Sequence, residues 1–179
     1  GDLLIAGDGT IYVSDSANPV IYRLAPDGDT LEPLITDQRF VSLQGMALSP
    51  DGRFLLVADY ALGLFAIDLE RSRVSSVSVP SGYTLLGLDG LAGTGPFIAT
   101  QNGVNPQRVL QITLDEEWTR VTEVTVLAAN SPLHDEITLG QIVGDGFVYV
   151  ANSQWNRFNP DGSIISDKPF TETVAVKIA

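Results

Sequence analysis

One short unit of sequence recurs along this chain: an apolar strand, a hairpin turn, and a second apolar strand that ends on a polar residue. The clearest copy runs from Leu43 to Tyr60 and turns at Pro50-Asp-Gly52. Proline pre-sets φ at the first central position of such a turn, aspartate can bond its own backbone, and glycine accepts a positive φ. A unit that recurs at a near-constant length predicts a repeat architecture.

Four copies of this unit can be followed along the 179 residues. Four short strands in up-and-down order, repeated about every 40 to 50 residues, are typical of the blades of a β-propeller. No segment shows a helical period over a useful length. We therefore predict an all-β chain of four-stranded antiparallel blades, which lie at residues 1–36, 43–80, 88–128 and 138–179.

The end of the fourth unit allows two interpretations. Either residues 156–158 form its third strand, or residues 156–172 form a long loop and Thr173–Ile178 is the third strand. We favour the second, because Val174–Ile178 alternates apolar and other residues as a strand does. The last blade is then one strand short, and an unpaired strand edge is a liability unless another segment fills it.

Two blade openings carry a family resemblance. Gln44-Gly-Met-Ala47, followed by its Pro-Asp-Gly turn, and Leu88-Asp-Gly-Leu-Ala92 resemble openings in the six-bladed propeller superfamily. That superfamily contains the gluconolactonases (regucalcin-like or SMP-30-like), strictosidine-synthase-like proteins and NHL-repeat proteins. At the level of repeats the resemblance covers nearly the whole chain. It implies a propeller of six blades, of which a second chain or residues outside this sequence supply about two.

The resemblance also implies a metal. Gluconolactonases hold an ion at the channel mouth with a glutamate, an asparagine that precedes a glycine, and an aspartate that precedes a glycine one blade later. Asp89-Gly90 matches the aspartate, and Gln44-Gly45 stands in the place of the asparagine with one more methylene. The family's glutamate belongs to an earlier blade. The expected cofactor is a divalent cation, Ca²⁺, with Asp89 and Gln44 as ligands.

Loop positions predict a polar face. In an up-and-down blade, the loops before the first strand and after the second strand lie on one face, where oxygen ligands can converge as calcium requires. Beside Asp89, the second candidate catalytic residue is His134, whose imidazole can titrate near neutrality. Short polar residues that end strands, such as Asp59, more often cap a turn. The candidate ligand-binding residues on this face are Tyr60, Asn102, Glu136, Gln154 and Trp155.

Two classes of function remain open. In the first, the chain is a metal-assisted hydrolase of a lactone or related ester, in which the ion polarises the carbonyl and activates water while Asp89 serves as ligand and general base. In the second, the polar channel face holds a small ligand or a protein without turnover, as NHL-type modules do. The fold by itself does not decide between them.

Composition excludes several other classes. A net charge of −12 argues against a nucleic-acid partner, which needs a basic footprint. The absence of cysteine and the single histidine exclude disulfides, thiol catalysis and zinc clusters. No apolar run reaches membrane-spanning length and no signal peptide is recognised, so no membrane span is expected. The composition leaves the compartment open, and we favour a periplasmic or secreted location over the cytoplasm.

Overall fold

The computed structural model describes residues 1–179 as four antiparallel sheets, each formed by one run of consecutive strands. The first sheet contains β1 (Leu3–Ile5), β2 (Ile11–Ser14), β3 (Val20–Leu24) and β4 (Glu32–Thr36). The second contains β5 (Leu43–Leu48), β6 (Phe54–Asp59), β7 (Gly63–Asp68) and β8 (Arg73–Ser76). The third contains β9 (Leu88–Ala92), β10 (Phe97–Gln101), β11 (Arg108–Leu114) and β12 (Val121–Ala129). The fourth contains β13 (Gly140–Val143), β14 (Gly146–Val150) and β15 (Ala175–Ile178).

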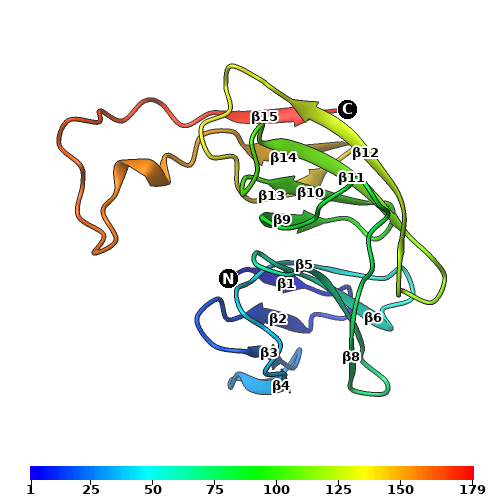
Figure 1. Ribbon diagram of the computed structural model, residues 1–179. Coiled ribbons are helices and arrows are strands. Elements are labelled where there is room, and N and C mark those ends of the chain that lie inside the picture. The colour runs from blue at the N-terminus through cyan, green and yellow to red at the C-terminus, as the bar shows by residue number, and fades with distance from the viewer.

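These sheets are the blades of a propeller arrangement. Within each sheet the strands follow one another in sequence order, and β1, β5, β9 and β13 are the first strands. These four inner strands lie next to one another in the middle of the view, and the outer strands of the blades lie above and below them (Figure 1). The prediction of an all-β chain with up-and-down blades is confirmed, and the number of six blades stays a prediction.

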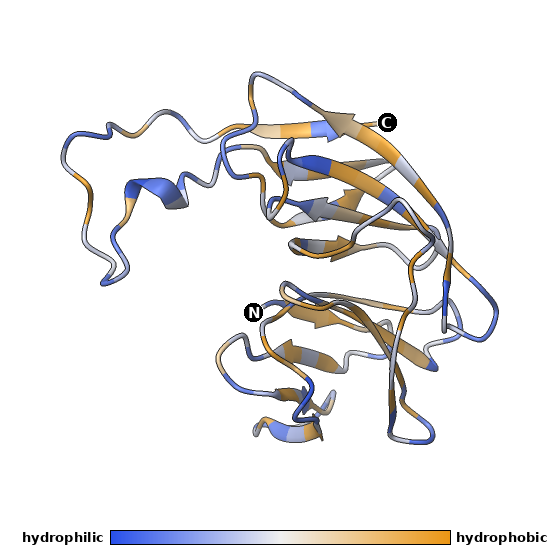
Figure 2. Ribbon diagram, in the orientation of Figure 1, coloured by the Kyte–Doolittle hydropathy of each residue, from blue (hydrophilic) through white to orange (hydrophobic).

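Alternation along the strands builds the core. Leu55 and Val57 of β6 pack with the first blade, whereas Leu56 and Ala58 pack with the third. Successive side chains of a strand point to opposite faces, so a strand covered on both faces must be apolar throughout. This is why β6 reads as a continuous apolar run rather than an alternating one. Figure 2 shows the apolar residues concentrated on the strands, with the polar residues mostly in the connections.

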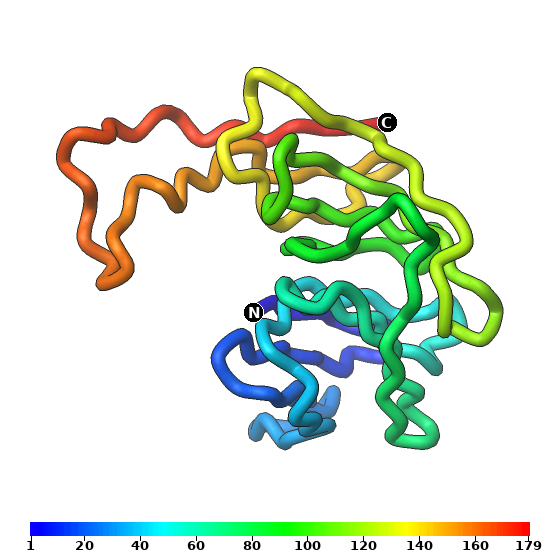
Figure 3. Tube along the Cα trace, in the orientation of Figure 1, coloured from blue at the N-terminus to red at the C-terminus, as the bar shows by residue number.

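The fourth blade has three strands, as the second interpretation of the tail predicted. β15 pairs with β14 in the register Val150↔Ala175 to Phe147↔Ile178. Residues 156–158 form no strand of this sheet, because Trp155–Arg157 is a short 3-10 helix, η1. Residues 153–173, here called the arm, leave the sheets between β14 and β15 (Figure 3).

Glycine lets the inner strands approach one another closely. A Cβ built at Gly45 of β5 would lie 2.8 Å from the carbonyl carbon of Gly90 and nearer still to the backbone nitrogen of Leu91. A Cβ at Gly90 would in turn lie 3.1 Å from Cα of Leu139, just before β13. The residues that precede these two glycines, Gln44 and Asp89, are thereby brought to the same end of the inner strands.

Replacing Gly45 tests this close approach. Gly45→Ala should lower the free energy of unfolding by roughly 1–3 kcal/mol, the usual cost of overpacking, because backbone atoms of β9 cannot rotate away from the new methyl group. Gly7→Ala is the control, since a Cβ there has no heavy atom within 4 Å. Urea unfolding of both variants measures the difference. Equal stability of the two would contradict the packing described here.

Candidate functional site

A cleft of about 440 Å³ opens where the inner strands begin. Its walls come from residues at or just before the start of β5, β9 and β13 and from the loops that follow β6, β10 and β14. The structure therefore brings together side chains that are far apart in the sequence, as the loop positions predicted. The lining residues are Gly1, Ser42, Gln44, Tyr60, Asp89, Asn102, Glu136, Thr138, Leu139 and Trp155.

Asp89 is the centre of the polar network in this cleft. Its Oδ2 accepts a hydrogen bond from Asn102 Nδ2 at 2.8 Å and another from Thr138 Oγ1 at 2.7 Å. Asn102 Nδ2 also donates to the carbonyl oxygen of Ile137 at 2.8 Å. These bonds hold one carboxylate oxygen in place between two blades. The other oxygen, Oδ1, accepts none and stays available.

Asn102 contributes an oxygen without a partner. Its Oδ1 is buried and accepts no hydrogen bond, because the amide nitrogen is the atom turned toward Asp89 and Ile137. A buried acceptor left unpaired costs about 1–3 kcal/mol. Such atoms in a cleft indicate a ligand that supplies the missing interaction, which here would be a donor or a cation.

Gln44 joins the first two blades at the edge of the cleft. Its backbone carbonyl accepts a hydrogen bond from Ser14 Oγ at 2.8 Å, and its amide nitrogen donates to Ser42 Oγ at 3.2 Å. Its side-chain oxygen accepts no hydrogen bond. Gln44 therefore lines the cleft, one blade away from Asp89, with an oxygen that can serve as a ligand.

The charge in the cleft is negative. Two carboxylates, Asp89 and Glu136, line it, and no lysine or arginine does. Burial raises the pKa of the Tyr60 hydroxyl, and the nearby charges of Asp89 and Glu136 raise it further. Tyr60 is therefore neutral and able to donate a hydrogen bond at physiological pH. Carboxylates in a cleft that no lysine or arginine lines favour a cation, or a ligand that carries one.

Asp2 is a charged neighbour that the sequence analysis did not single out. It directly precedes β1, the first inner strand, and burial raises the pKa of its carboxyl, to which the negative charge of Asp89 adds. Its position at the start of an inner strand, close to the positions of Gln44 and Asp89 in their strands, was the available signal. The weak repeat at the start of the chain concealed it.

Glu136 connects the cleft to the arm. Its Oε2 accepts a hydrogen bond from the backbone nitrogen of Asn156 at 2.6 Å, while neighbouring Asp135 pairs with Arg157 at 2.9 Å. These contacts fix η1 beside the cleft, so that Trp155 forms part of its wall although its side chain is 65% exposed. Glu136 thus has one carboxylate oxygen engaged in positioning the arm.

Gln154 lies outside the cleft. Only 4% exposed, it holds the base of the arm through its side-chain oxygen, which accepts from the backbone nitrogen of Thr171 at 2.8 Å. Its amide nitrogen donates to the carbonyl of Thr171 at 3.1 Å. Of the candidate ligand-binding residues, Gln154 is thus the one that the structure assigns to the scaffold of the arm.

His134 also lies away from the cleft walls. Its Nε2 is 2.8 Å from the Tyr149 hydroxyl, and its Nδ1 is buried without a hydrogen-bond partner. Burial lowers the pKa of the imidazole. The structure therefore does not bring His134 to Asp89, the other candidate catalytic residue.

Strand-end residues behave as turn caps. Asp59 is fully buried, and its Oδ1 accepts from the backbone nitrogens of Ala61 and Leu62. Its Oδ2 accepts from those of Val41 and Ser42 at 2.8 and 3.1 Å. All its bonding capacity is used within the scaffold, which positions the loop carrying Ser42.

The donors in the cleft suit a hard cation better than a soft one. No group of three histidine, cysteine, aspartate or glutamate residues is close enough to hold a metal. The atoms without partners are instead one carboxylate oxygen of Asp89 and the amide oxygens of Asn102 and Gln44. Carboxylate and amide oxygens are the ligands that calcium accepts, in sets of about six to eight. The cleft residues fit part of such a set.

The single histidine allows a direct test of the burial of His134. Because the folded-state pKa lies below the unfolded-state value, the folded protein binds fewer protons, and stability is lost as the pH falls through the folded-state pKa. We expect the loss to begin as the pH falls below about 6.5, the ordinary pKa of histidine. NMR titration of the imidazole in native and urea-unfolded protein measures the two pKa values. Equal values would contradict this account, and His134→Gln should flatten the pH dependence of unfolding.

Comparison with known proteins supports the fold. No protein-family model and no curated protein sequence matches this chain. A chain of a nidogen–laminin complex is similar in structure, with a TM-score of 0.63 and 16% identity over 87% of this chain and 72% of that one. Virginiamycin B lyase from Staphylococcus aureus gives a TM-score of 0.62 and 15% identity over 98% of this chain and 54% of the lyase. A gluconolactonase from Xanthomonas campestris gives 0.57 and 16% over 84% of this chain and 53% of the enzyme. The chain thus spans about half the length of both enzymes, and at these identities the likeness establishes the propeller fold alone.

Proposed function

We propose that the cleft binds a divalent cation, Ca²⁺, and hydrolyses a lactone or related ester. The observation that carries the proposal is the presence of two oxygen atoms without hydrogen-bond partners, Asp89 Oδ1 and the buried Asn102 Oδ1, on residues of a cleft that two carboxylates and no lysine or arginine line. A cleft lined by carboxylates attracts cations in preference to anions.

Three side chains of this chain supply the proposed ligands. Asp89 contributes the charge, and Asn102 and Gln44 contribute neutral oxygens. Thr138 and Asn102 orient the carboxylate through the two hydrogen bonds to Oδ2, as outer partners of metal ligands commonly do. Calcium needs more oxygens than these, so water, the substrate or further blades must complete the set.

When bound, such an ion polarises a carbonyl and lowers the pKa of a water molecule. The residues of the chain would accept a proton, donate a hydrogen bond and hold the substrate. Besides serving as a ligand, the carboxylate of Asp89 can accept the proton of the attacking water as a general base. Tyr60, neutral because its pKa is raised, can donate to a substrate oxygen. Trp155 offers an aromatic wall against which the apolar face of a ring can pack.

The structural comparisons support this proposal at the level of the fold. A gluconolactonase shares the propeller arrangement, and so does a lyase. Neither is close enough in sequence to transfer its activity, so the proposal rests on the cleft. A second candidate function is binding without turnover, and the similarity to a chain of a nidogen–laminin complex favours it, because that structure is a protein complex.

Replacing the central carboxylate tests the metal site. Asp89→Asn should weaken Ca²⁺ binding by about tenfold or more, because the charged ligand becomes neutral. The fold should persist, since an amide oxygen can still accept the bonds from Asn102 and Thr138. Calorimetric titration with Ca²⁺ measures the affinity, and circular dichroism checks the fold. Asp27→Asn, at an exposed turn in the first blade, is the control and should bind as the parent does.

Activity separates the two candidate functions. Hydrolysis of simple δ-lactones, followed by acid release, should require Ca²⁺, should stop with a chelator and should be lost in Asp89→Asn. Calcium binding without hydrolysis would favour the binding function. Unchanged calcium affinity in Asp89→Asn would remove the metal site, and with it the proposed hydrolase.

A partner surface belongs to the same proposal. The inner strands of the two outermost blades expose apolar side chains, among them Ile5 of β1 and Val143 of β13. Together with the three-stranded fourth blade, they indicate that further blades, from the same or a second chain, complete the propeller.

We therefore expect this chain to associate in solution through these surfaces. Sedimentation velocity over a range of concentrations measures the association, and Ile5→Glu should weaken it because a charge is placed on the apolar surface. A stable monomer of 19.1 kDa at all concentrations would contradict this expectation.

A further inference from the structure

A second concave site lies at the other end of the blades, away from the cleft. A groove of about 430 Å³ runs between the turn that joins β7 to β8 and the turn that joins β11 to β12. In an up-and-down blade these turns lie on the face opposite to the loops that line the cleft. We call it the interblade groove and define it by Phe54, Arg71, Arg73, Glu116, Glu117 and Trp118.

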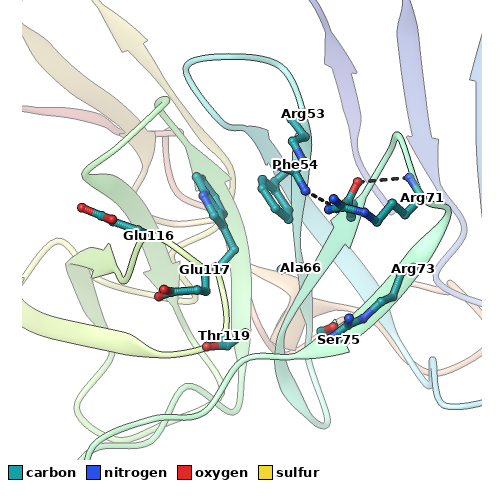
Figure 4. Close-up of a pocket in the computed structure, with 11 residues that line it drawn as sticks. Arg53, Phe54, Ala66, Arg71, Arg73, Ser75, Glu116, Glu117 and Thr119 are labelled. Carbon is teal, nitrogen blue, oxygen red and sulfur yellow. Dashed lines mark hydrogen bonds and ion pairs between the residues drawn. The ribbon is translucent and has the colours of Figure 1, made fainter.

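The two walls of the interblade groove carry opposite charges. Arg71 and Arg73 stand on the second blade, and Glu116 and Glu117 stand across from them on the third (Figure 4). Arg73, Glu116 and Glu117 form no salt bridge, and none of their side chains makes a hydrogen bond within the chain. Because each wall lies beyond ion-pair distance of the other, the charges are left for a ligand that enters between them.

Asp68 holds two of the arginines on the second-blade side of the groove, Arg53 and Arg71, in place. Asp68, 6% exposed, accepts from Arg53 and from Arg71, each at 2.8 Å. The same carboxylate accepts from the backbone nitrogens of Glu70 and Arg71, which fixes the turn. Nε of Arg53 is buried and has no hydrogen-bond partner. Three of the ten basic residues in a chain of net charge −12 therefore meet at this one groove.

An aromatic surface lies between the charged walls. The rings of Phe54 and Trp118 are stacked, with centroids 5.3 Å apart and planes 7° from parallel. The Arg53 guanidinium lies 4.8 Å from the centroid of Phe54. Backbone bonds from Ser78 to Thr119 and from Val121 to Ser78, both 2.9 Å, join the blades at the end of the groove. The groove is therefore a built surface between joined blades.

We propose that the interblade groove binds a peptide segment of another protein, in which an acidic and a basic side chain flank an apolar residue. The acidic side chain pairs with Arg73 and Arg71, the basic one pairs with Glu116 and Glu117, and the apolar residue covers the indole of Trp118. Exposed ion pairs contribute only about 0–1 kcal/mol each. A free amino acid would gain little from them, whereas a peptide adds the burial of apolar area along the groove.

Fluorescence of Trp118 tests the proposal. The chain has two tryptophans, so Trp155→Phe leaves Trp118 as the reporter. The probes are two blocked pentapeptides with opposite charge order, acetyl-Glu-Ala-Leu-Ala-Lys-amide and acetyl-Lys-Ala-Leu-Ala-Glu-amide. A third, with glutamine at both ends, is the uncharged control. Each is titrated up to about 5 mM, which covers weak specific binding.

We expect one of the charged peptides to give a saturable change and the glutamine peptide to bind more weakly by about tenfold or more. Arg73→Glu should weaken binding of the charged peptide by a similar factor. The control Arg23→Glu, at an exposed site of the first blade, should leave binding unchanged. Higher salt should weaken binding, because the charges are exposed. Circular dichroism confirms that each variant is folded.

Three results would overturn the proposal: no saturable change with either charged peptide, equal binding of the glutamine peptide, or equal binding by Arg73→Glu and Arg23→Glu. Since the groove and the cleft lie on opposite faces, Asp89→Asn should leave peptide binding as it is. The peptide-binding proposal and the metal-site proposal can therefore be supported or contradicted independently of each other.

Discussion

The close approach of the inner strands is the constraint on which the rest of this structure depends. Gly45 and Gly90 have no side chain, so the backbone of β5 can lie against β9 and that of β9 against the start of β13. Each blade then splays outward and packs its faces against its neighbours. A side chain at either glycine would separate the blades and expose the apolar faces that hold them together.

The same constraint creates the cleft. The first residues of the inner strands lie near the common axis, so Gln44 and Asp89, each the second residue of its strand, line one cavity although about 45 residues of sequence separate them. The bonds of Asp89 to Asn102 and Thr138 then tie the third blade to the fourth. The site and the scaffold share their interactions, which is why one carboxylate oxygen is fixed while the other stays free.

The two faces of the molecule differ in how their charges are arranged. On the cleft face, carboxylates gather without a lysine or arginine among the lining residues, which suits a cation. On the opposite face, acidic and basic side chains stand across a stacked aromatic pair, which suits a ligand that carries both charges. One net charge for the whole chain conceals this difference. The arrangement arises because the turns of different blades meet at one end and their loops at the other.

The sequence by itself determined the class of fold, the blade repeat and most strand positions, because turn residues and apolar periodicity are local signals. The last predicted strand, Thr173–Ile178, forms as β15 (Ala175–Ile178). The sequence also predicted that Gln44, Tyr60, Asp89, Asn102, Glu136 and Trp155 share one face, since propeller topology brings equivalent positions together. Only the tertiary structure decided that Gln154 holds the arm, that His134 pairs with Tyr149 away from the cleft, and that Asp2 approaches Asp89. It alone also placed Arg73 across from Glu117, because contacts between blades depend on the directions of individual side chains, which no local pattern encodes.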